Sequence, residues 1–277
     1  MKITYFGTTT LLFDDGQDQI LFDCHITRPS LPVFLFGRLR TDTALADRLL
    51  LAHGIGRLRA IFISHSHHDH VMDAPYIAWK CGADIYGTES TLNVARGGSV
   101  REPRLHHFEK QTDIGAFSVQ PILSIHSKPN LFNNDIGQTI DRSVIQPARR
   151  QDYREGGSYD FLVTHEGKRY LIRPSFNCLK GQLDGVRANV LFQSVAGLSR
   201  ADGDTVSAFF RETVEKTGPE CIIPIHWDNF FRPLSKPVRA IPWPIDDTGK
   251  SMRILADYCA AHRIQCLVQL PLTTIDL

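Results

Sequence analysis

Paired cysteines, long apolar runs and an excess of either charge are all missing from this 277-residue sequence. The six cysteines include no C-x-x-C pair, which is typical of reduced, packed thiols in a cytoplasmic protein. No run approaches the roughly 18 apolar residues of a membrane-spanning helix, and the acidic residues Asp14 and Asp15 come too early for a secretory signal. The formal net charge of +1 gives no electrostatic reason to expect a nucleic-acid or membrane-surface partner. We therefore expect a cytoplasmic protein with neither kind of partner.

Local basic residues are the exception to this balance. The stretch PARRQDYRE (147–155) carries three arginines, and its composition favours a solvated loop over a binding patch. Arg28 and Arg142 are candidate anion contacts on their position alone. The charge pattern therefore leaves the chemistry of the substrate open.

The first part of the chain is predicted to be α/β, with the 42% hydrophobic and 22% charged content of a soluble globular protein. Strands are expected at 2–7, 10–15, 19–24, 59–64 and 83–87, and a helix at 44–54. Asp73 and Pro75 suit the cap and first turn of another helix that runs to Gly82. Segment 25–42 is broken by proline and glycine, so we expect a surface loop there.

The second half of the chain shows a similar alternation of predicted strands and helices. Strands are expected within 117–127, 159–174, 188–197 and 220–227, and helices within 205–218 and 251–263. His165 precedes a turn and is expected to be exposed. The irregular segment between His126 and Tyr159 is typical of a functional loop or lid. Because no linker divides the chain, we predict one domain, residues 1–277, built from two similar halves.

A cluster of histidines and an aspartate follows the apolar run RAIFIS (59–64) directly. Its members are His65, His67, Asp69 and His70, in the pattern HxHxDH, with His68 at a variable position. Imidazole nitrogens and carboxylate oxygens are the ligands that zinc and related divalent ions accept. A single cluster cannot complete two coordination spheres, so further ligands are expected at other strand ends.

Two later histidines have the same context. His126 follows the strand around 119–125, and His226 follows the apolar run CIIPI. Another strand ends within 170–177. Since active sites of α/β sheets collect where strands end, these positions are expected to converge on the HxHxDH cluster.

In these residues the chain resembles the metallo-β-lactamase superfamily, over nearly its whole length. It most resembles the branch of metal-dependent hydrolases that includes lactonases acting on sugar phosphates and some phosphodiesterases. The resemblance implies an α/β fold, a four-layer αββα sandwich with the metal site at the edge between two mixed sheets. It implies a first metal held by His65, His67 and His126. It implies a second metal held by Asp69, His70 and His226.

The resemblance also implies the chemistry. A bridging hydroxide would be the nucleophile, and Asp69 would orient it or shuttle a proton to the leaving group. The expected cofactor is one or two Zn²⁺ ions, with Mn²⁺ or Fe²⁺ as alternatives because such sites accept all three.

The chain departs from the family pattern at one position. Ser175 stands where the family usually has an aspartate that bridges the two ions. The second ion is therefore expected to bind more weakly, or with help from water or from Asp228. Asp23 is either a carboxylate that orients a ligating histidine or a turn cap, and His25 either lines the pocket or does not.

We therefore expect a metal-dependent hydrolase that cleaves an ester, lactone or phosphodiester bond of a small molecule. The loops at 25–43, 127–158 and 228–247 would set its specificity. The alternatives are an RNA-processing nuclease, which the balanced charge disfavours, and a metal-binding protein with a decayed catalytic site. The sequence does not fix the subunit number, so a homo-oligomer stays open.

Overall fold

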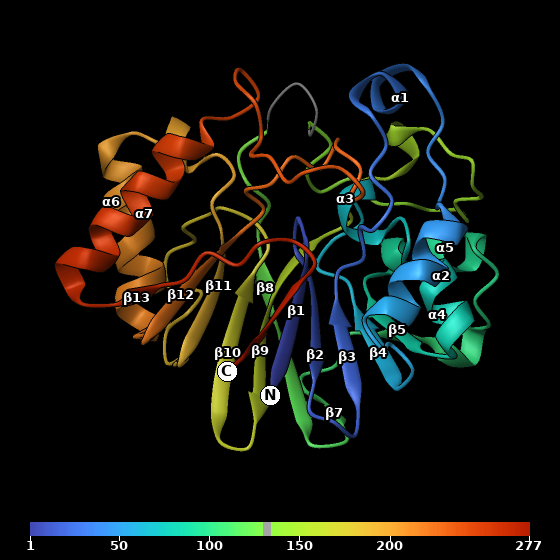
Figure 1. The fold of residues 1–277 in the computed structure, drawn as a ribbon, viewed down its shortest axis with the longest axis horizontal. Helices are drawn as coiled ribbons and strands as arrows, with labels where there is room; N and C mark the ends of the chain where they lie inside the picture. The colour runs from blue at the N-terminus through green and yellow to red at the C-terminus, as the bar shows by residue number, and fades with distance from the viewer. Residues whose placement is uncertain (130–133) are drawn as a thin grey trace.

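Two seven-stranded sheets pack face to face, and helices cover both outer faces (Figure 1). The structure, a computed structural model, describes residues 1–129 and 134–277. The sheet orders are β14-β1-β2-β3-β4-β5-β6 and β13-β12-β11-β10-β9-β8-β7. The predicted αββα sandwich with two mixed sheets is confirmed.

The first sheet begins as an antiparallel meander and continues as a parallel sheet from β3 to β6. Its strands are β1 (Lys2–Gly7), β2 (Thr10–Asp14), β3 (Gln19–Phe22), β4 (Leu58–Phe62), β5 (Asp84–Gly87), β6 (Leu105–His107) and β14 (Thr273–Asp276). The strand β14 from the C-terminus pairs with β1, so the two ends of the chain meet in one sheet. The sequence did not predict β6 or β14, because both are short and largely solvent-exposed.

The second sheet has the same plan, with antiparallel strands from β7 to β10 and parallel strands from β10 to β13. Its strands are β7 (Thr112–Ile114), β8 (Phe117–Ser124), β9 (Ser158–His165), β10 (Lys168–Arg173), β11 (Val190–Ser194), β12 (Cys221–Ile225) and β13 (Gln265–Cys266). Aromatic rings join the two sheets: Phe13 contacts Tyr170 and Phe192, and Phe22 contacts Phe161, at centroid distances of 5.2–5.9 Å. This apolar layer holds the strand ends of both sheets in fixed relative positions.

Seven α-helices are present in the described part of the chain. They are α1 (Leu31–Phe36), α2 (Thr43–Ala52), α3 (His68–Val71), α4 (Ala74–Cys81), α5 (Glu89–Gly97), α6 (Gly203–Phe210) and α7 (Thr248–His262). Shorter turns of 3₁₀-helix are η1 (Glu102–Arg104), η2 (Arg150–Asp152) and η3 (Leu198–Arg200), and a π-helical turn, η4 (Arg211–Glu215), continues α6. None of the helices in these ranges has the length and apolar character needed to span a lipid bilayer.

Two local predictions were wrong, those for segment 25–42 and His165, and one, for Asp73 as the N-cap of α4, was confirmed in position only. Segment 25–42 is not entirely loop, because it contains the short helix α1, which has Pro32 in its first turn and buries Phe34. Asp73 precedes α4 as predicted, but its carboxylate caps no helix N–H group and instead accepts 2.7 Å hydrogen bonds from the backbone of Ile26 and Thr27. His165 is buried, not exposed, because its ring packs 4.8 Å from that of Phe117 and its Nε2 lies 3.2 Å from Asp15.

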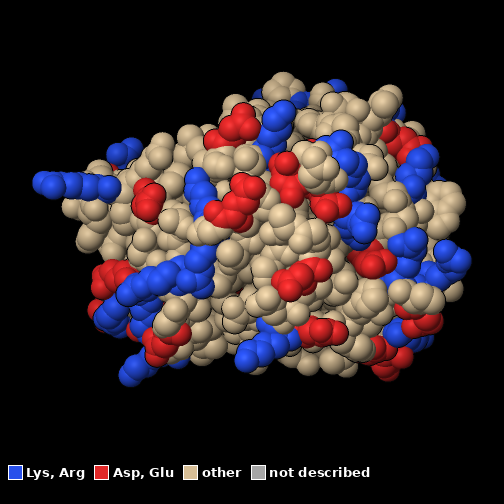
Figure 2. Space-filling view, turned by 90° about the horizontal axis from the view of Figure 1, so that it is seen from below, with Lys and Arg blue, Asp and Glu red and all other residues tan. Residues whose placement is uncertain are grey.

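The charges on the surface are mixed. In the view from below, acidic and basic side chains are interspersed and no broad field of one sign forms (Figure 2). This mixture on the face in view agrees with the net charge of +1.

Candidate metal centre

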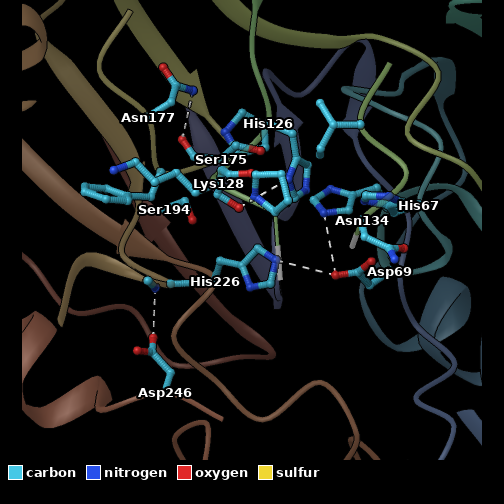
Figure 3. A pocket seen from close by; sticks show the side chains of 18 of the residues that line it. His67, Asp69, His126, Lys128, Asn134, Ser175, Asn177, Ser194, His226 and Asp246 are labelled. Carbon is cyan, nitrogen blue, oxygen red and sulfur yellow. Dashed lines mark hydrogen bonds and ion pairs between the residues drawn. The ribbon is translucent and has the colours of Figure 1, made fainter. Parts of the chain in front are cut away.

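The predicted ligands come from three strand ends at one edge of the sandwich. The HxHxDH segment follows β4, with Asp69 and His70 on the short helix α3; His126 follows β8 and His226 follows β12. His226 has a positive φ of 58°, a conformation that turns the chain sharply at the end of its strand. These turns direct the side chains into one space (Figure 3).

The structure assembles the six side chains into two triads. His65, His67 and His126 each offer a ligand atom within 4.8 Å of the others, and the same holds for Asp69, His70 and His226. The rings of His65 and His70 are 3.8 Å apart between centroids, so the triads lie side by side. The two groups are the ones that the family resemblance implies.

His65 and His126 are neutral imidazoles at neutral pH, the form that binds a metal ion. Burial lowers the pKa of His65 well below its usual value and lowers that of His126 to about 3. Nε2 of His65 is buried and has no hydrogen-bond partner within the described residues. Buried polar atoms are almost always satisfied, and coordination of a metal would satisfy this one. The donor set therefore fits a divalent metal ion.

Asp23 holds one of these imidazoles. Its Oδ2 accepts hydrogen bonds from Thr9 Oγ1 at 2.6 Å and Ser64 Oγ at 2.9 Å, and lies 2.7 Å from His70 Nδ1. Its Oδ1 accepts from the Ser64 backbone at 2.7 Å. The carboxylate thus fixes the ring of His70 with Nε2 directed away from it, as expected for an orienting carboxylate.

Asp135 is a second such carboxylate, which the sequence did not predict. Its two oxygens lie 3.1 and 3.3 Å from His67 Nε2, which leaves Nδ1 of that ring for the triad. The backbone N–H of Glu155 donates to Asp135 at 3.1 Å, and buried Glu155 in turn accepts from Gly137, Gly157 and Ser158. No sequence signal marks Asp135, because it lies in a segment without periodicity.

Asp69 carries the negative charge of the second triad. Its Oδ2 lies 3.5 Å from His226 Nε2 and 3.6 Å from His70 Nε2. Burial alone would raise the pKa of Asp69, but the neighbouring imidazoles of His70, His68 and His226 lower it well below its usual value. Asp69 is therefore ionised at neutral pH, and it can bind a cation or accept a proton and pass it on.

Ser175 follows β10 and lines the same cavity (Figure 3). Two residues on, the Asn177 amide donates to Ile125 O at 2.8 Å and accepts from Arg173 Nη2 at 2.7 Å. Arg173 is buried and pairs with Asp160 at 2.9 Å. This network ties the end of β10 to the end of β8, immediately before His126.

Four other predicted positions lie outside the cavity. His25 is fully buried behind the HxHxDH segment, with its ring 5.8 Å from that of His68, and it does not line the cavity. Asp228 cannot assist a second ion, because it forms a buried 2.7 Å ion pair with Arg28 and accepts from Tyr5 Oη at 2.8 Å. This pairing also removes Arg28 as an anion contact, and Arg142 is exposed and remote from the cavity lining.

The cavity above the two triads has a volume of about 850 Å³. Residues from all three segments that were expected to set specificity line it, among them Phe34, Arg150 and Phe231. A space of this size can enclose a small molecule. The metal triads form part of its wall.

Comparison with known proteins agrees with this arrangement. A protein of Heliobacterium modesticaldum named UPF0173 metal-dependent hydrolase is 34% identical over 86 residues, 31% of this chain and 29% of that protein. The match thus spans less than a third of the relative's length.

Solved structures share the whole fold at low identity. The isothiocyanate hydrolase from Delia radicum gut bacteria has a TM-score of 0.61 and 13% identity, covering 100% of this chain and 99% of that one. CmlA, a diiron β-hydroxylase from Streptomyces venezuelae, has a TM-score of 0.60 and 14% identity, covering 100% of this chain and 54% of that one. The family model described as the metallo-beta-lactamase superfamily matches residues 5–146, half of the chain, including both HxHxDH and His126. The chain belongs to the metallo-β-lactamase superfamily.

Proposed function

We propose that the chain is a metal-dependent hydrolase that uses water to cleave an ester, lactone or phosphodiester bond of a small substrate. The observation that carries this proposal is the pair of triads on the wall of an 850 Å³ cavity. A site that only stores metal needs no such cavity. The relative named as a metal-dependent hydrolase supports the same class of activity.

In this proposal the first triad, His65, His67 and His126, holds one ion and the second triad holds another. Bound ions would lower the pKa of water toward neutrality and polarise the carbonyl or phosphoryl oxygen of the substrate. Asp69 would receive a proton from the nucleophile and deliver it to the leaving group. Asp23 and Asp135 would keep His70 and His67 in the required orientations.

We propose zinc as the metal, since histidine-rich sites with one carboxylate suit it. Manganese and iron are accepted by the same ligands, and the structurally similar CmlA is named as a diiron protein. We also propose a cytoplasmic location, for which all six cysteines being free is the supporting observation.

The test begins with elemental analysis of the purified protein. The metal is then removed, single metals are restored, and esters, lactones, phosphodiesters and a structured RNA are screened for cleavage. We expect metal-dependent turnover of at least one small substrate, and none by the variant with His65→Ala and His67→Ala. Retained metal without turnover of any substrate would instead favour a decayed site, and turnover of the RNA alone would favour a nuclease.

A further inference from the structure

Basic side chains without an ion-pair partner among the described residues line the cavity. Four basic side chains line it: Lys128, Arg150, Arg154 and Arg200. Arg200 donates to the carbonyl oxygens of Pro244 and Ile245. Within residues 1–129 and 134–277, the side chains of the other three have no ion-pair or hydrogen-bond partner.

The carboxylates of the cavity are already engaged. Asp69 belongs to the second triad and Asp135 contacts His67. Asp202 caps α6 through the N–H of Thr205 at 2.8 Å. Asp246 accepts from the Gly197 backbone at 3.0 Å and from Ser199 Oγ at 2.6 Å. Asp202 interacts electrostatically with Lys128, but none of the four carboxylates forms an ion pair with Arg150 or Arg154 within the described residues.

Arg150 is the best placed of these cations. It is half-buried on η2, and its Nε is buried without an acceptor among the described residues. Its guanidinium lies 5.4 Å from the centroid of the Phe34 ring, and that ring lies 4.8 Å from the ring of His68 in the HxHxDH segment. A guanidinium over an aromatic ring can still present its edge to a planar anion. Arg150 therefore presents a partly buried positive charge in the cavity, linked through Phe34 to His68 of the HxHxDH segment.

Aromatic side chains form an apolar surface in the same cavity. The rings of Phe34 and Phe231 are 5.1 Å apart, those of Phe231 and Phe230 are 4.4 Å apart, and Phe230 contacts His226 at 5.4 Å. These rings connect Arg150 to the second triad. Apolar contact and one or two polar anchors are the usual combination in small-molecule sites.

We propose that the substrate carries an anionic group, a carboxylate or a phosphate, bound by Arg150 with Arg154 beside it, and an apolar group that packs on Phe34, Phe230 and Phe231. This inference rests on the proposed hydrolase function and specifies its substrate class. Both groups flank the bond that the metal site cleaves. The segment PARRQDYRE thus contributes two of its three arginines to the cavity, against the prediction of a solvated loop.

The kinetic test uses two esters of equal chain length, mono-4-nitrophenyl glutarate, which ends in a carboxylate, and 4-nitrophenyl pentanoate, which ends in a methyl group. The metal-loaded protein is expected to prefer the anionic ester. Arg150→Gln should raise KM for that ester about ten- to hundredfold, the effect of losing hydrogen bonds to a charged group, and should leave the neutral ester unchanged. The matched control is Arg142→Gln, an exposed arginine of the loop 127–158 that does not line the cavity.

A binding test separates this inference from the proposed function. Phenylacetate, phenylphosphonate and neutral benzyl alcohol are titrated into the metal-loaded protein by calorimetry. We expect the anions to bind more tightly, to lose affinity in Arg150→Gln but not in Arg142→Gln, and their ranking to tell carboxylate from phosphate. Phe231→Ala should weaken the binding of phenylacetate but not the binding of acetate.

The outcomes are distinguishable. If neither ester is hydrolysed while the anions bind through Arg150, the hydrolase proposal fails with these substrates and the anion site stands. If both esters are hydrolysed equally and Arg150→Gln changes neither KM nor anion affinity, the substrate inference is overturned and the hydrolase stands.

Discussion

Removal of the Asp135 carboxylate should weaken one metal site and spare the other. In Asp135→Ala, His67 loses the acceptor that lies 3.1 Å from its Nε2 and is then free to rotate or to change tautomer. Loss of such an outer partner typically lowers metal affinity about 10- to 100-fold, or about 1.4–2.7 kcal/mol. Because the Asp135 side chain is 21% exposed, water can replace part of the interaction, and we expect the lower end, about tenfold.

Zinc titration of the metal-free protein against a competing chelator would measure this loss. Asp141→Ala is the matched control, since Asp141 is an exposed aspartate of the same segment. Unfolding of the metal-free variant should be measured as well, because the Glu155 N–H also loses its acceptor. Unchanged affinity, or an equal loss at both sites, would show that Asp135 does not act through His67.

Four further changes test the site and its support. The double variant His65→Ala, His67→Ala should lose tight metal retention, and full metal content by elemental analysis would contradict the ligand assignment. Asp69→Asn should lower kcat by roughly two orders of magnitude or more with a smaller effect on KM, so unchanged turnover on a verified substrate would exclude its role. Burial raises the pKa of Asp73 from 3.8 to about 6, so this group loses its stabilising contribution as the pH rises through that range. Relative to the unsubstituted protein, Asp73→Asn should therefore have a free energy of unfolding about 1 kcal/mol more favourable at pH 7.5 than at pH 5, measured by urea unfolding. An equal effect at both pH values would refute this. Ser175→Asp should strengthen the weaker of two unequal metal sites in calorimetric titration, and no change would show that Ser175 is not at the bridging position.

The part of the site that the sequence predicted is the part fixed by strand ends. HxHxDH, His126 and His226 each follow an apolar run, and apolar runs of this length are recognisable as buried strands. Parallel strands in one sheet end at the same edge, so residues far apart in the sequence converge there without any knowledge of loop geometry. The αββα layers were predictable for the same reason, through the family resemblance of these residues.

The part that the sequence did not predict depends on contacts between irregular segments. Arg150 faces the cavity because the neighbouring residue Ala148 exchanges backbone hydrogen bonds of 2.6 and 2.9 Å with Leu39, in the segment that contains α1. Asp135 reaches His67 because Glu155 connects the loop to β9 and to Ser66. Neither segment has a hydrophobic period, and such pairings cannot be derived from local composition.

The hydrogen-bond systems behind the two triads overlap at Ser64, whose Oγ donates to Asp23 and lies 3.1 Å from His65 Nδ1 and 3.3 Å from His70 Nδ1. His67 depends on Asp135 and the loop that Glu155 organises, whereas His70 depends on Asp23 at the end of β3. A bridging carboxylate would couple the two sites by screening the repulsion between ions about 3.5–4 Å apart, and Ser175 supplies no such charge. Asp23 thus reaches both triads, through His70 directly and through Ser64 to His65, whereas Asp135 contacts only the first triad, at His67. A change in the loop 127–158 that displaces Asp135 would then alter the first metal site alone. The same loop carries Arg150, so it would affect both the occupancy of that site and the binding of the substrate.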